Sequence, residues 1–290
     1  MRKRVVIENR LGEKVEFGPL PPYVLVSIDL SGSEADTVRT QGYMQEGVTT
    51  GAVTMREMQY PMEFYIEGGS LADVYGYRRH LNRILNPKLG PFIITITLPH
   101  GTFQNTIVIE SLPKYRPEDE QFMILQQGLL HITTPDPYWK NEIDIEVPLL
   151  SWEPIFSFPF SFRPKVQFGY KGEKQNVVNN GDVETPVKIE IFGPCTDPQI
   201  TNLTTMKSVK INRDILAGER LEINTAYRQN TVELVGIDGT RRNAYNWIAP
   251  GVRLNEFRLQ IGLNILDYSA NTGRESATVI IRFRERYIGI

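Results

Sequence analysis

The sequence predicts a mainly β protein with a single long helix. Apolar and polar residues alternate with period two in many segments, which is the pattern of strands that bury one face. Only one segment combines helical spacing with capping residues. The chain has 290 residues, of which 41% are hydrophobic and 23% charged, so it has globular composition and enough length for a large core. At about 150 residues per domain, the length favours two domains.

The strands are predicted from alternation. The clearest case is 257–265, where five apolar residues at every second position predict one half-buried antiparallel strand. Pro99 to Thr102 is a short, glycine-containing link, which predicts a hairpin between 92–98 and 103–112. The other alternating segments are 60–66 and 277–283.

The helix is predicted at 70–86. Ser70 and Asp73 form an S-x-x-D capping signature, and Pro87 ends the helix. The apolar stripe consists of Leu71, Val74, Tyr77, Leu81, Ile84 and Leu85. Basic residues in the later half suit the negative end of the helix dipole. These are Arg78, Arg79 and Arg83, which are either a solvated basic face or candidate contacts with another subunit.

Composition changes at 152–164, where phenylalanine and proline concentrate. We therefore predict domains at 1–150 and 151–290, with 151–165 as the junction. Frequent proline excludes a helix there and limits pairing in a central ladder. The junction is either a linker that docks on its neighbouring domain or an arm that packs on another subunit. Residues 31–58 are long and weakly patterned, which indicates a functional loop or an extended hairpin.

Charge and cysteine content exclude several classes of protein. With 32 basic and 34 acidic residues, the chain has no global field to hold a nucleic acid. No apolar run reaches the roughly 20 residues of a membrane span, and the apolar run after the basic N-terminus is too short for a signal peptide. The single cysteine, Cys195, cannot form an internal disulfide, which fits assembly in a reducing cytoplasm.

The sequence contains no catalytic or cofactor motif that we recognise. Its three histidines, His80, His100 and His131, lack metal-ligand spacing, and the common phosphate-binding, dinucleotide-binding and serine-nucleophile motifs are missing. A pair of glycosidase carboxylates needs no local motif. The candidates are Glu184, Glu190, Glu222 and Glu233, which lie in or beside alternating strands where surface placement is the simplest account. We predict a protein without cofactor, metal or catalytic site, and so not an enzyme.

Two proline- and glycine-containing turns are predicted to be architectural. Pro135, Asp136 and Pro137 end a strand and direct Tyr138 and Trp139 toward the core of the first domain. Asn180 and Gly181 are expected to supply the positive φ angles of a tight turn.

The second turn leads into another strand. Asp182 is expected to accept hydrogen bonds from nearby backbone N–H groups, and Pro186 starts the strand 187–191.

The order of four short motifs resembles a known family. Thr133–Trp139 closes the first half, Phe158–Phe160 sits in the junction, Asn179–Pro186 opens the second half, and Arg286–Ile290 ends it. This arrangement, over essentially the whole chain, resembles the distal tail proteins of bacteriophages with long non-contractile tails.

The resemblance implies a baseplate hub. The N-terminal β-barrel-like or β-sandwich domain with its helix would form a homo-hexameric ring between the tail-tube protein and the tail-tip or tail-associated lysin protein. The C-terminal domain would be a galectin-like (jelly-roll) β-sandwich that supports receptor-binding proteins or touches cell-wall saccharide. DNA would pass through the channel without specific binding. Such a protein is made in the host bacterial cytoplasm and resides in the virion, at the tail tip.

The contacts of such a ring are predicted to involve the helix, the segment 31–58 and the following hairpin. Two other functions stay open at this point. One is a monomeric carbohydrate-binding or glycan-cleaving β-sandwich. Tyr245 and Trp247 are the candidate saccharide contacts of such a protein. The alternative for these residues is a capping turn whose tryptophan is buried. The other function is a tail-tube subunit, which would form long tubes instead of discrete rings.

Overall fold

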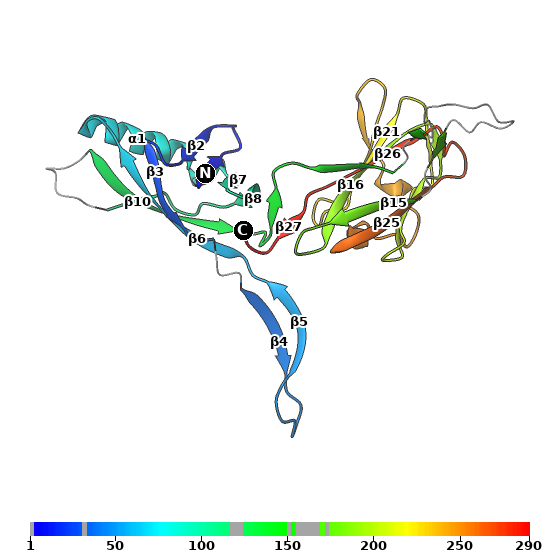
Figure 1. The fold of residues 1–290 in the computed structure, drawn as a ribbon, viewed down its shortest axis with the longest axis horizontal. Helices are drawn as coiled ribbons and strands as arrows, with labels where there is room; N and C mark the ends of the chain where they lie inside the picture. The colour runs from blue at the N-terminus through cyan, green and yellow to red at the C-terminus, as the bar shows by residue number, and fades with distance from the viewer. Residues whose placement is uncertain (1–2, 31–33, 117–123, 150–151, 155–168, 172–173) are drawn as a thin grey trace, which may run out of the picture. The chain divides into compact units, whose positions relative to one another are not determined.

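The computed structural model describes residues 3–30, 34–116, 124–149, 152–154, 169–171 and 174–290. It is mainly β, as predicted, and divides into two compact units (Figure 1). The first unit contains residues 1–142 and 287–290, and the second contains 143–286. The chain therefore passes between the units twice. The predicted junction at 151–165 lies largely outside the described residues, so the domain boundary after residue 150 stays a prediction.

In its described residues, the first unit contains one α-helix and two larger sheets. Its elements are β1 (Arg4–Glu8), β2 (Lys14–Phe17), β3 (Tyr23–Ile28), β4 (Ala35–Thr40), β5 (Thr49–Met55), β6 (Met58–Glu67), α1 (Leu71–Ile84), the 3₁₀ turn η1 (Pro87–Leu89), β7 (Phe92–Leu98), β8 (Gly101–Ile107), β9 (Lys114–Tyr115), β10 (Leu125–Thr134), β11 (Trp139–Asn141) and β27 (Arg286–Tyr287). The six-stranded sheet has the order β2-β1-β7-β8-β11-β27, and the four-stranded sheet has the order β3-β6-β10-β9. The predicted hairpin is the β7–β8 pair.

One hydrophobic core lies between these sheets and α1. Alternation buries one face of each strand, so β6 contributes Tyr60, Met62, Phe64 and Ile66 to this core. The helix adds Val74, Leu81 and Ile84 from its apolar stripe. Apolar burial of this kind, at roughly 25 cal/mol per Å², is the main force that joins the layers.

The helix begins and ends as its sequence predicts. The Ser70 hydroxyl accepts a hydrogen bond from the Asp73 backbone N–H at 3.3 Å, which satisfies one of the free N–H groups of the first turn. The last helical residue is Ile84, and Pro87 opens the next short turn. The S-x-x-D signature is therefore a reliable local signal in this chain.

The second unit is a two-sheet sandwich. Its elements are β12 (Ile145–Pro148), β13 (Trp152–Pro154), β14 (Gly169–Lys171), β15 (Lys174–Asn179), β16 (Thr185–Phe192), β17 (Cys195–Thr196), β18 (Gln199–Asn202), β19 (Lys207–Lys210), β20 (Asp214–Ile215), β21 (Arg220–Asn224), β22 (Thr231–Val235), β23 (Arg241–Asn243), η3 (Tyr245–Trp247), η4 (Leu254–Glu256), β24 (Arg258–Leu259), β25 (Gly262–Ser269) and β26 (Thr278–Phe283). A seven-stranded sheet, β12-β26-β16-β21-β22-β23 with β24 beside β16, shares a hydrophobic core with the four-stranded sheet β15-β25-β18-β19.

The single strand predicted at 257–265 is wrong. The chain forms β24, turns, and continues as β25, with Gly262 at a φ of +82°. Phe257 and Leu259 are buried, whereas Ile261 is 61% exposed, so the buried face changes at the turn. The turn is held by the Asn264 side chain, whose Nδ2 donates to the Gln260 carbonyl at 2.8 Å and whose Oδ1 accepts from the Gln260 N–H. The period-two spacing of apolar residues does not reveal that the buried face of the chain changes at a turn.

Residues 287–290 complete the first unit after the second unit has been traversed. β27 is the edge strand of the six-stranded sheet. The Tyr287 ring packs edge-on against Phe103 with 5.4 Å between centroids, and Ile290 packs against the same core. The first unit is thus assembled from two separate parts of the sequence.

Candidate functional site

The three arginines of α1 differ in their surroundings. The Arg78 guanidinium lies 4.3 Å from the Tyr115 ring centroid and 5.0 Å from that of Tyr75, which are cation–π distances. Arg83 forms an ion pair with Glu13 at 3.0 Å. Arg79 is exposed and has no hydrogen bond or ion pair within the described part of the chain. Of the predicted subunit contacts, Arg79 is the one with a free guanidinium among the described residues.

A shallow groove of about 440 Å³ runs along α1 beside the start of β3. It is lined by Pro22, Tyr23, Ala72, Asp73, Gly76, Tyr77 and His80. The Tyr23 hydroxyl donates to the Tyr77 carbonyl at 3.0 Å and lies 3.0 Å from His80 Nδ1. Burial raises the pKa of Tyr23 to about 12, helped by the neighbouring Tyr77. The groove therefore has a fixed aromatic wall.

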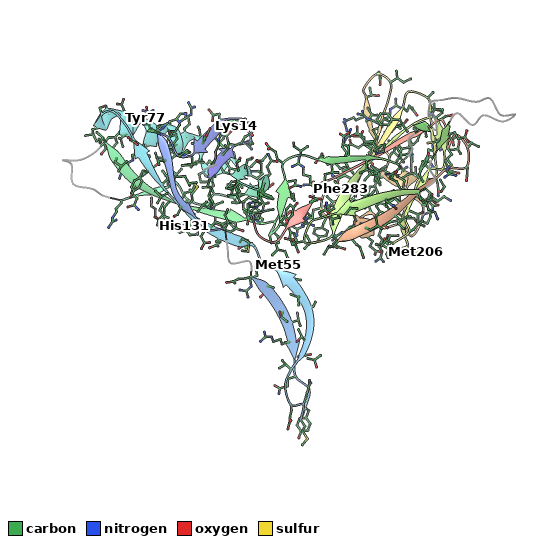
Figure 2. All side chains as sticks on the ribbon, viewed as in Figure 1. Lys14, Met55, Tyr77, His131, Met206 and Phe283 are labelled. Atoms are coloured by element: carbon green, nitrogen blue, oxygen red, sulfur yellow. The ribbon has the colours of Figure 1, made fainter. Side chains whose placement is uncertain are left out.

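The segment predicted as a functional loop or extended hairpin is a hairpin. Strands β4 and β5 pair with each other and, in the described residues, with no other strand (Figure 1). Almost all its residues are exposed, and its side chains stand clear of the rest of the first unit beyond Met55 (Figure 2). At its tip, Tyr43 is 97% and Met44 87% exposed. A monomer gains nothing from exposing such side chains, so the hairpin is a candidate binding element.

Contacts between oppositely charged side chains join the two strands at the base of this hairpin. Arg56 pairs with Glu34 at 3.4 Å and also donates a hydrogen bond to the Asp36 carboxylate. The hydrogen bond from Arg56, with a smaller contribution from its charge, holds the pKa of Asp36 below its ordinary value. The contacts of Arg56 with Glu34 and Asp36 therefore join the start of β4 to the end of β5.

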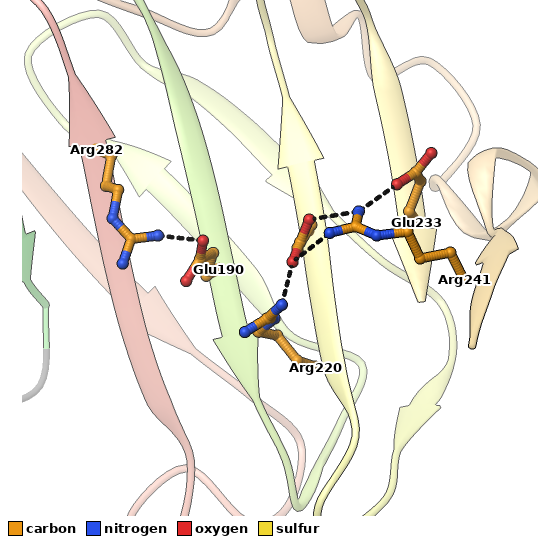
Figure 3. Close-up of polar contacts among 6 residues, drawn as sticks. Glu190, Arg220, Glu233, Arg241 and Arg282 are labelled. Atoms are coloured by element: carbon orange, nitrogen blue, oxygen red, sulfur yellow. Dashed lines mark hydrogen bonds and ion pairs between the residues drawn. The ribbon is translucent and has the colours of Figure 1, made fainter. Parts of the chain in front are cut away.

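One face of the seven-stranded sheet carries two separate groups of paired opposite charges (Figure 3). Arg282 on β26 pairs with Glu146 at 2.6 Å and with Glu190 on β16. Arg241 on β23 joins Glu222 and Glu233, at 2.9 and 2.7 Å. Opposite charges on adjacent strands stabilise the pairing of those strands.

These ion pairs include the glycosidase candidates. Glu190, Glu222 and Glu233 all contact arginines of the same sheet, and Glu184 pairs with Arg258. The arrangement has the geometry of a surface ladder, with each carboxylate bound to a guanidinium. This favours the structural interpretation of these residues over a pair of catalytic carboxylates across a cleft.

The first predicted turn directly follows β10 and is held by hydrogen bonds of Asp136. Asp136 Oδ1 accepts from the Tyr138 N–H at 3.2 Å, and its carbonyl accepts from Asn105 Nδ2 at 2.9 Å. Pro135 and Pro137 flank this residue, directly after the end of β10. The chain then enters β11 with Trp139 fully buried, 5.9 Å from the Tyr60 ring.

The second turn differs from its prediction. Neither Asn180 nor Gly181 has a positive φ. Glycine is required there because a Cβ on Gly181 would lie 2.7 Å from the Arg286 carbonyl oxygen. Asn180 donates to Glu285 from its backbone and side chain, at 3.2 and 3.0 Å, and the Asp182 N–H donates to the Arg286 carbonyl. The turn is thus held by the segment after β26.

Trp247 and Tyr245 lie in the 3₁₀ turn η3. Trp247 is partly buried against the core, and the Arg213 guanidinium lies over its ring at 5.6 Å. Tyr245 is exposed. The Trp247 ring therefore makes contacts within the fold, and both its role in saccharide binding and the alternative of a buried capping turn stay predictions.

Metal-ligand clusters and membrane helices are not found in the described ranges. No group of three His, Cys, Asp or Glu side chains there has the arrangement of a metal site. Within the same ranges, none of the helices combines the length and the hydropathy of a membrane crossing. Cys195 is buried, which raises the pKa of its thiol.

Comparison with known proteins gives a consistent result. Residues 180–287 match the family model "Siphovirus-type tail component, C-terminal domain". No curated protein sequence matches the chain. The crystal structure of Dit from phage SPP1, titled a paradigm of the hub adsorption apparatus in phages that infect Gram-positive bacteria, is similar with a TM-score of 0.64 at 12% identity. That match covers 97% of this chain and 98% of Dit.

A second similar structure is the baseplate of phage P2 in its activated conformation with calcium. It has a TM-score of 0.58 at 10% identity, with complete coverage of both chains. The resemblance to distal tail proteins that the motif order predicts is confirmed. Residues 180–287 match the family of siphovirus-type tail component C-terminal domains, and the chain shares the fold of Dit from phage SPP1 over nearly its whole length.

Proposed function

We propose that this protein is the hub of a bacteriophage tail tip, in which six copies form a ring. The observation that carries the proposal is the combination of a tail-component domain with a two-unit fold shared, end to end, with a hub protein. The exposed β4–β5 hairpin supports it, because a two-stranded ribbon is marginally stable in water without a surface to pack on.

The proposed division of labour follows the two domains. Residues 1–150 form the ring, with α1, the hairpin and the β7–β8 pair as contact elements, and residues 151–290 face outward. Arg79 is the strongest of the three arginine candidates, because Arg78 and Arg83 already have partners within their own chain. A heterologous contact that repeats around a closed rotation leaves no exposed end, so modest contacts add up to a stable ring.

The proposed partners follow from this position. The ring joins the tail-tube protein to the tail-tip or tail-associated lysin protein, and the outward domain supports a receptor-binding protein or touches cell-wall saccharide. DNA passes through the channel without specific contacts, which the net charge of −2 supports. The protein works without a cofactor, is made in the host cytoplasm and resides at the virion tail tip.

The test is absolute mass by light scattering, with negative-stain imaging of the same peak. Six copies of 33.2 kDa give about 199 kDa, or twice that for two stacked rings, and a central hole. The tail-tube subunit alternative predicts long tubes. A particle of 33.2 kDa, alone and after addition of purified tail-tube and tail-tip proteins, would contradict the proposal.

A further inference from the structure

The two ends of the seven-stranded sheet expose different side chains. Where β21 begins and β22 ends, the turns expose the aliphatic side chains of Leu216 and Ile237, at 62% and 80%. Where β21 ends and β22 begins, the loop 225–230 and the turn η3 expose Tyr227 and Tyr245, at 67% and 47%. These two are the exposed aromatic rings among the described side chains of the second unit. We call the first the aliphatic end and the second the tyrosine end.

The pairing of the strands brings the two tyrosines to the same end. The loop 225–230 leads directly into the start of β22. The Ala244 backbone N–H donates to the Val232 carbonyl at 2.8 Å, so η3 begins beside the first residues of the same strand. In the described part of the chain, the hydroxyls of Tyr227 and Tyr245 form no hydrogen bond. Both rings are therefore available to a ligand at one place on the surface.

The loop that carries Tyr227 is held in shape from inside. Thr225 is fully buried, and its hydroxyl accepts from the Val187 N–H at 2.8 Å and donates to the Val187 carbonyl at 3.0 Å. The Asn224 side chain accepts from the Ala226 N–H at 3.0 Å. A loop that is fixed in this way loses little conformational entropy when it binds a ligand.

Arg228 supplies a cation that no described acid neutralises. Its φ is +62°, a left-handed conformation that residues other than glycine adopt at a cost. Its guanidinium lies 5.5 Å from the Tyr227 ring centroid and, among the described residues, forms no hydrogen bond or ion pair. The acids of β21 and β22, Glu222 and Glu233, are already bound to Arg241. A free guanidinium suits a carboxylate or a phosphate, which accepts two parallel N–H bonds.

The polar groups at the tyrosine end favour a sugar over a protein. Gln229 of the loop and Asn246 of η3 are exposed, and their side chains form no hydrogen bond in the described residues. A sugar ring has polarised C–H groups on its face and hydroxyls at its edge, so an aromatic face and amide groups together can bind it. A protein partner is expected at the aliphatic end instead, because the buried centre of a protein interface is apolar.

We propose that the tyrosine end binds an acidic saccharide, with the rings of Tyr227 and Tyr245 against sugar faces and Arg228 on the anionic group. This inference rests on the proposed function, in which the outward domain touches cell-wall saccharide, and it assigns that contact to a site. The site does not include Trp247, whose ring is partly packed against the core and lies under the Arg213 guanidinium.

The first test is binding of small probes to the full chain, titrated by saturation-transfer difference NMR. The probes are glucose 1-phosphate, glucose, and glycerol 1-phosphate, which carries the anion without a sugar ring. We expect glucose 1-phosphate to bind about tenfold more tightly than either other probe, because it alone offers both a sugar face and an anion. No binding of glucose 1-phosphate, or binding equal to that of another probe, overturns the inference.

The second test places the binding at this end of the sheet. Tyr227→Ala and Arg228→Gly each weaken glucose 1-phosphate binding about tenfold, whereas Tyr227→Phe keeps the ring and the binding. Glycine fits the positive φ of residue 228, so the loop keeps its shape. The matched controls are Met206→Gly, at another exposed residue with positive φ, and Ile237→Ala, at the aliphatic end. Both controls leave binding unchanged, and losses equal to those at 227 and 228 overturn the assignment.

The outcomes separate this inference from the proposed function. Rings of the expected mass that bind no glucose 1-phosphate overturn the inference and leave the hub standing. A chain that binds the probe through Tyr227 and Arg228 but stays at 33.2 kDa with the tail proteins present contradicts the hub and leaves the site standing. A tail protein whose binding is lost in Tyr227→Ala, without any binding of the sugar probe, shows a protein interface at this end and overturns the saccharide assignment.

Discussion

The seven-stranded sheet of the second unit and the β4–β5 hairpin of the first unit both expose strands to water, yet they do so differently. On the sheet, carboxylates and guanidiniums of adjacent strands pair with each other, as in the chain of contacts from Glu146 through Arg282 to Glu190. On the described residues of the hairpin, charges pair only at the base, around Arg56, and the far half ends in exposed apolar side chains. The described charges of the sheet are largely paired with one another, whereas the hairpin exposes apolar side chains at its tip.

The largest effect should come from the hairpin tip. Combining Tyr43→Ser with Met44→Asn removes both apolar anchors, and asparagine tolerates the positive φ of residue 44. Self-association should weaken on the order of 100-fold, since two buried anchors of an interface are lost, while the thermal unfolding midpoint stays unchanged. Light scattering and calorimetry measure the two quantities. Met206→Asn is the matched control, and equal losses in both proteins would refute the contrast between the two regions.

A smaller effect is expected at Arg282. The Glu190 side chain is only 16% exposed, and Arg282→Ala removes its cation. We expect the free energy of unfolding to fall by about 1 kcal/mol, with allowance for solvent screening. Urea unfolding followed by tryptophan fluorescence measures this. Ring mass should not change, and a loss of assembly would show that this face is also an interface.

The next smaller effect is expected at Arg241, on the edge strand. Its side chain is 53% exposed, so solvent screening weakens the electrostatic stabilisation from the ion pairs with Glu222 and Glu233. Arg241→Ala should shift the urea midpoint less than Arg282→Ala does. The opposite order would mean that the ion pairs of Arg241, on the edge strand, contribute more to the free energy of unfolding than those of Arg282.

The smallest effect concerns pH at the hairpin base. The pKa of Asp36 is held below 3.8 in the folded protein, so the contribution of this group is fully present above 3.8 and is lost as pH falls through the lowered pKa. Glu34 faces the same arginine. Titration of Asp36 should therefore leave ring assembly unchanged from pH 7 to about 5.

The Asp36 carboxyl itself can be followed by NMR titration. Its midpoint should lie below 3.8 in the wild type and move up to the ordinary value in Arg56→Gln, which removes the hydrogen bond. A midpoint that does not respond to this substitution would contradict the pairing.

Local signals predicted the local structure well. The Ser70 and Asp73 cap, the stop at Pro87 and the alternation of β6 all depend on residues within a few positions of one another, and the structure has these elements where the sequence predicts them. The mistaken strand at 257–265 shows where such signals end. The alternation there is real, but the side chain of Asn264 and the positive φ of Gly262 turn the chain and exchange its buried face.

The sequence by itself determined the period of the strands, the place of the helix and the order of motifs that resembles distal tail proteins. Tertiary structure decided which charges meet: Arg83 contacts Glu13 and Arg282 contacts Glu146 across long separations in the chain, while Arg79 pairs with no other described residue. It also returned residues 287–290 to the first unit. The physical reason is that backbone period and caps arise from neighbours in sequence, whereas pairing and closure depend on sheet register between distant segments.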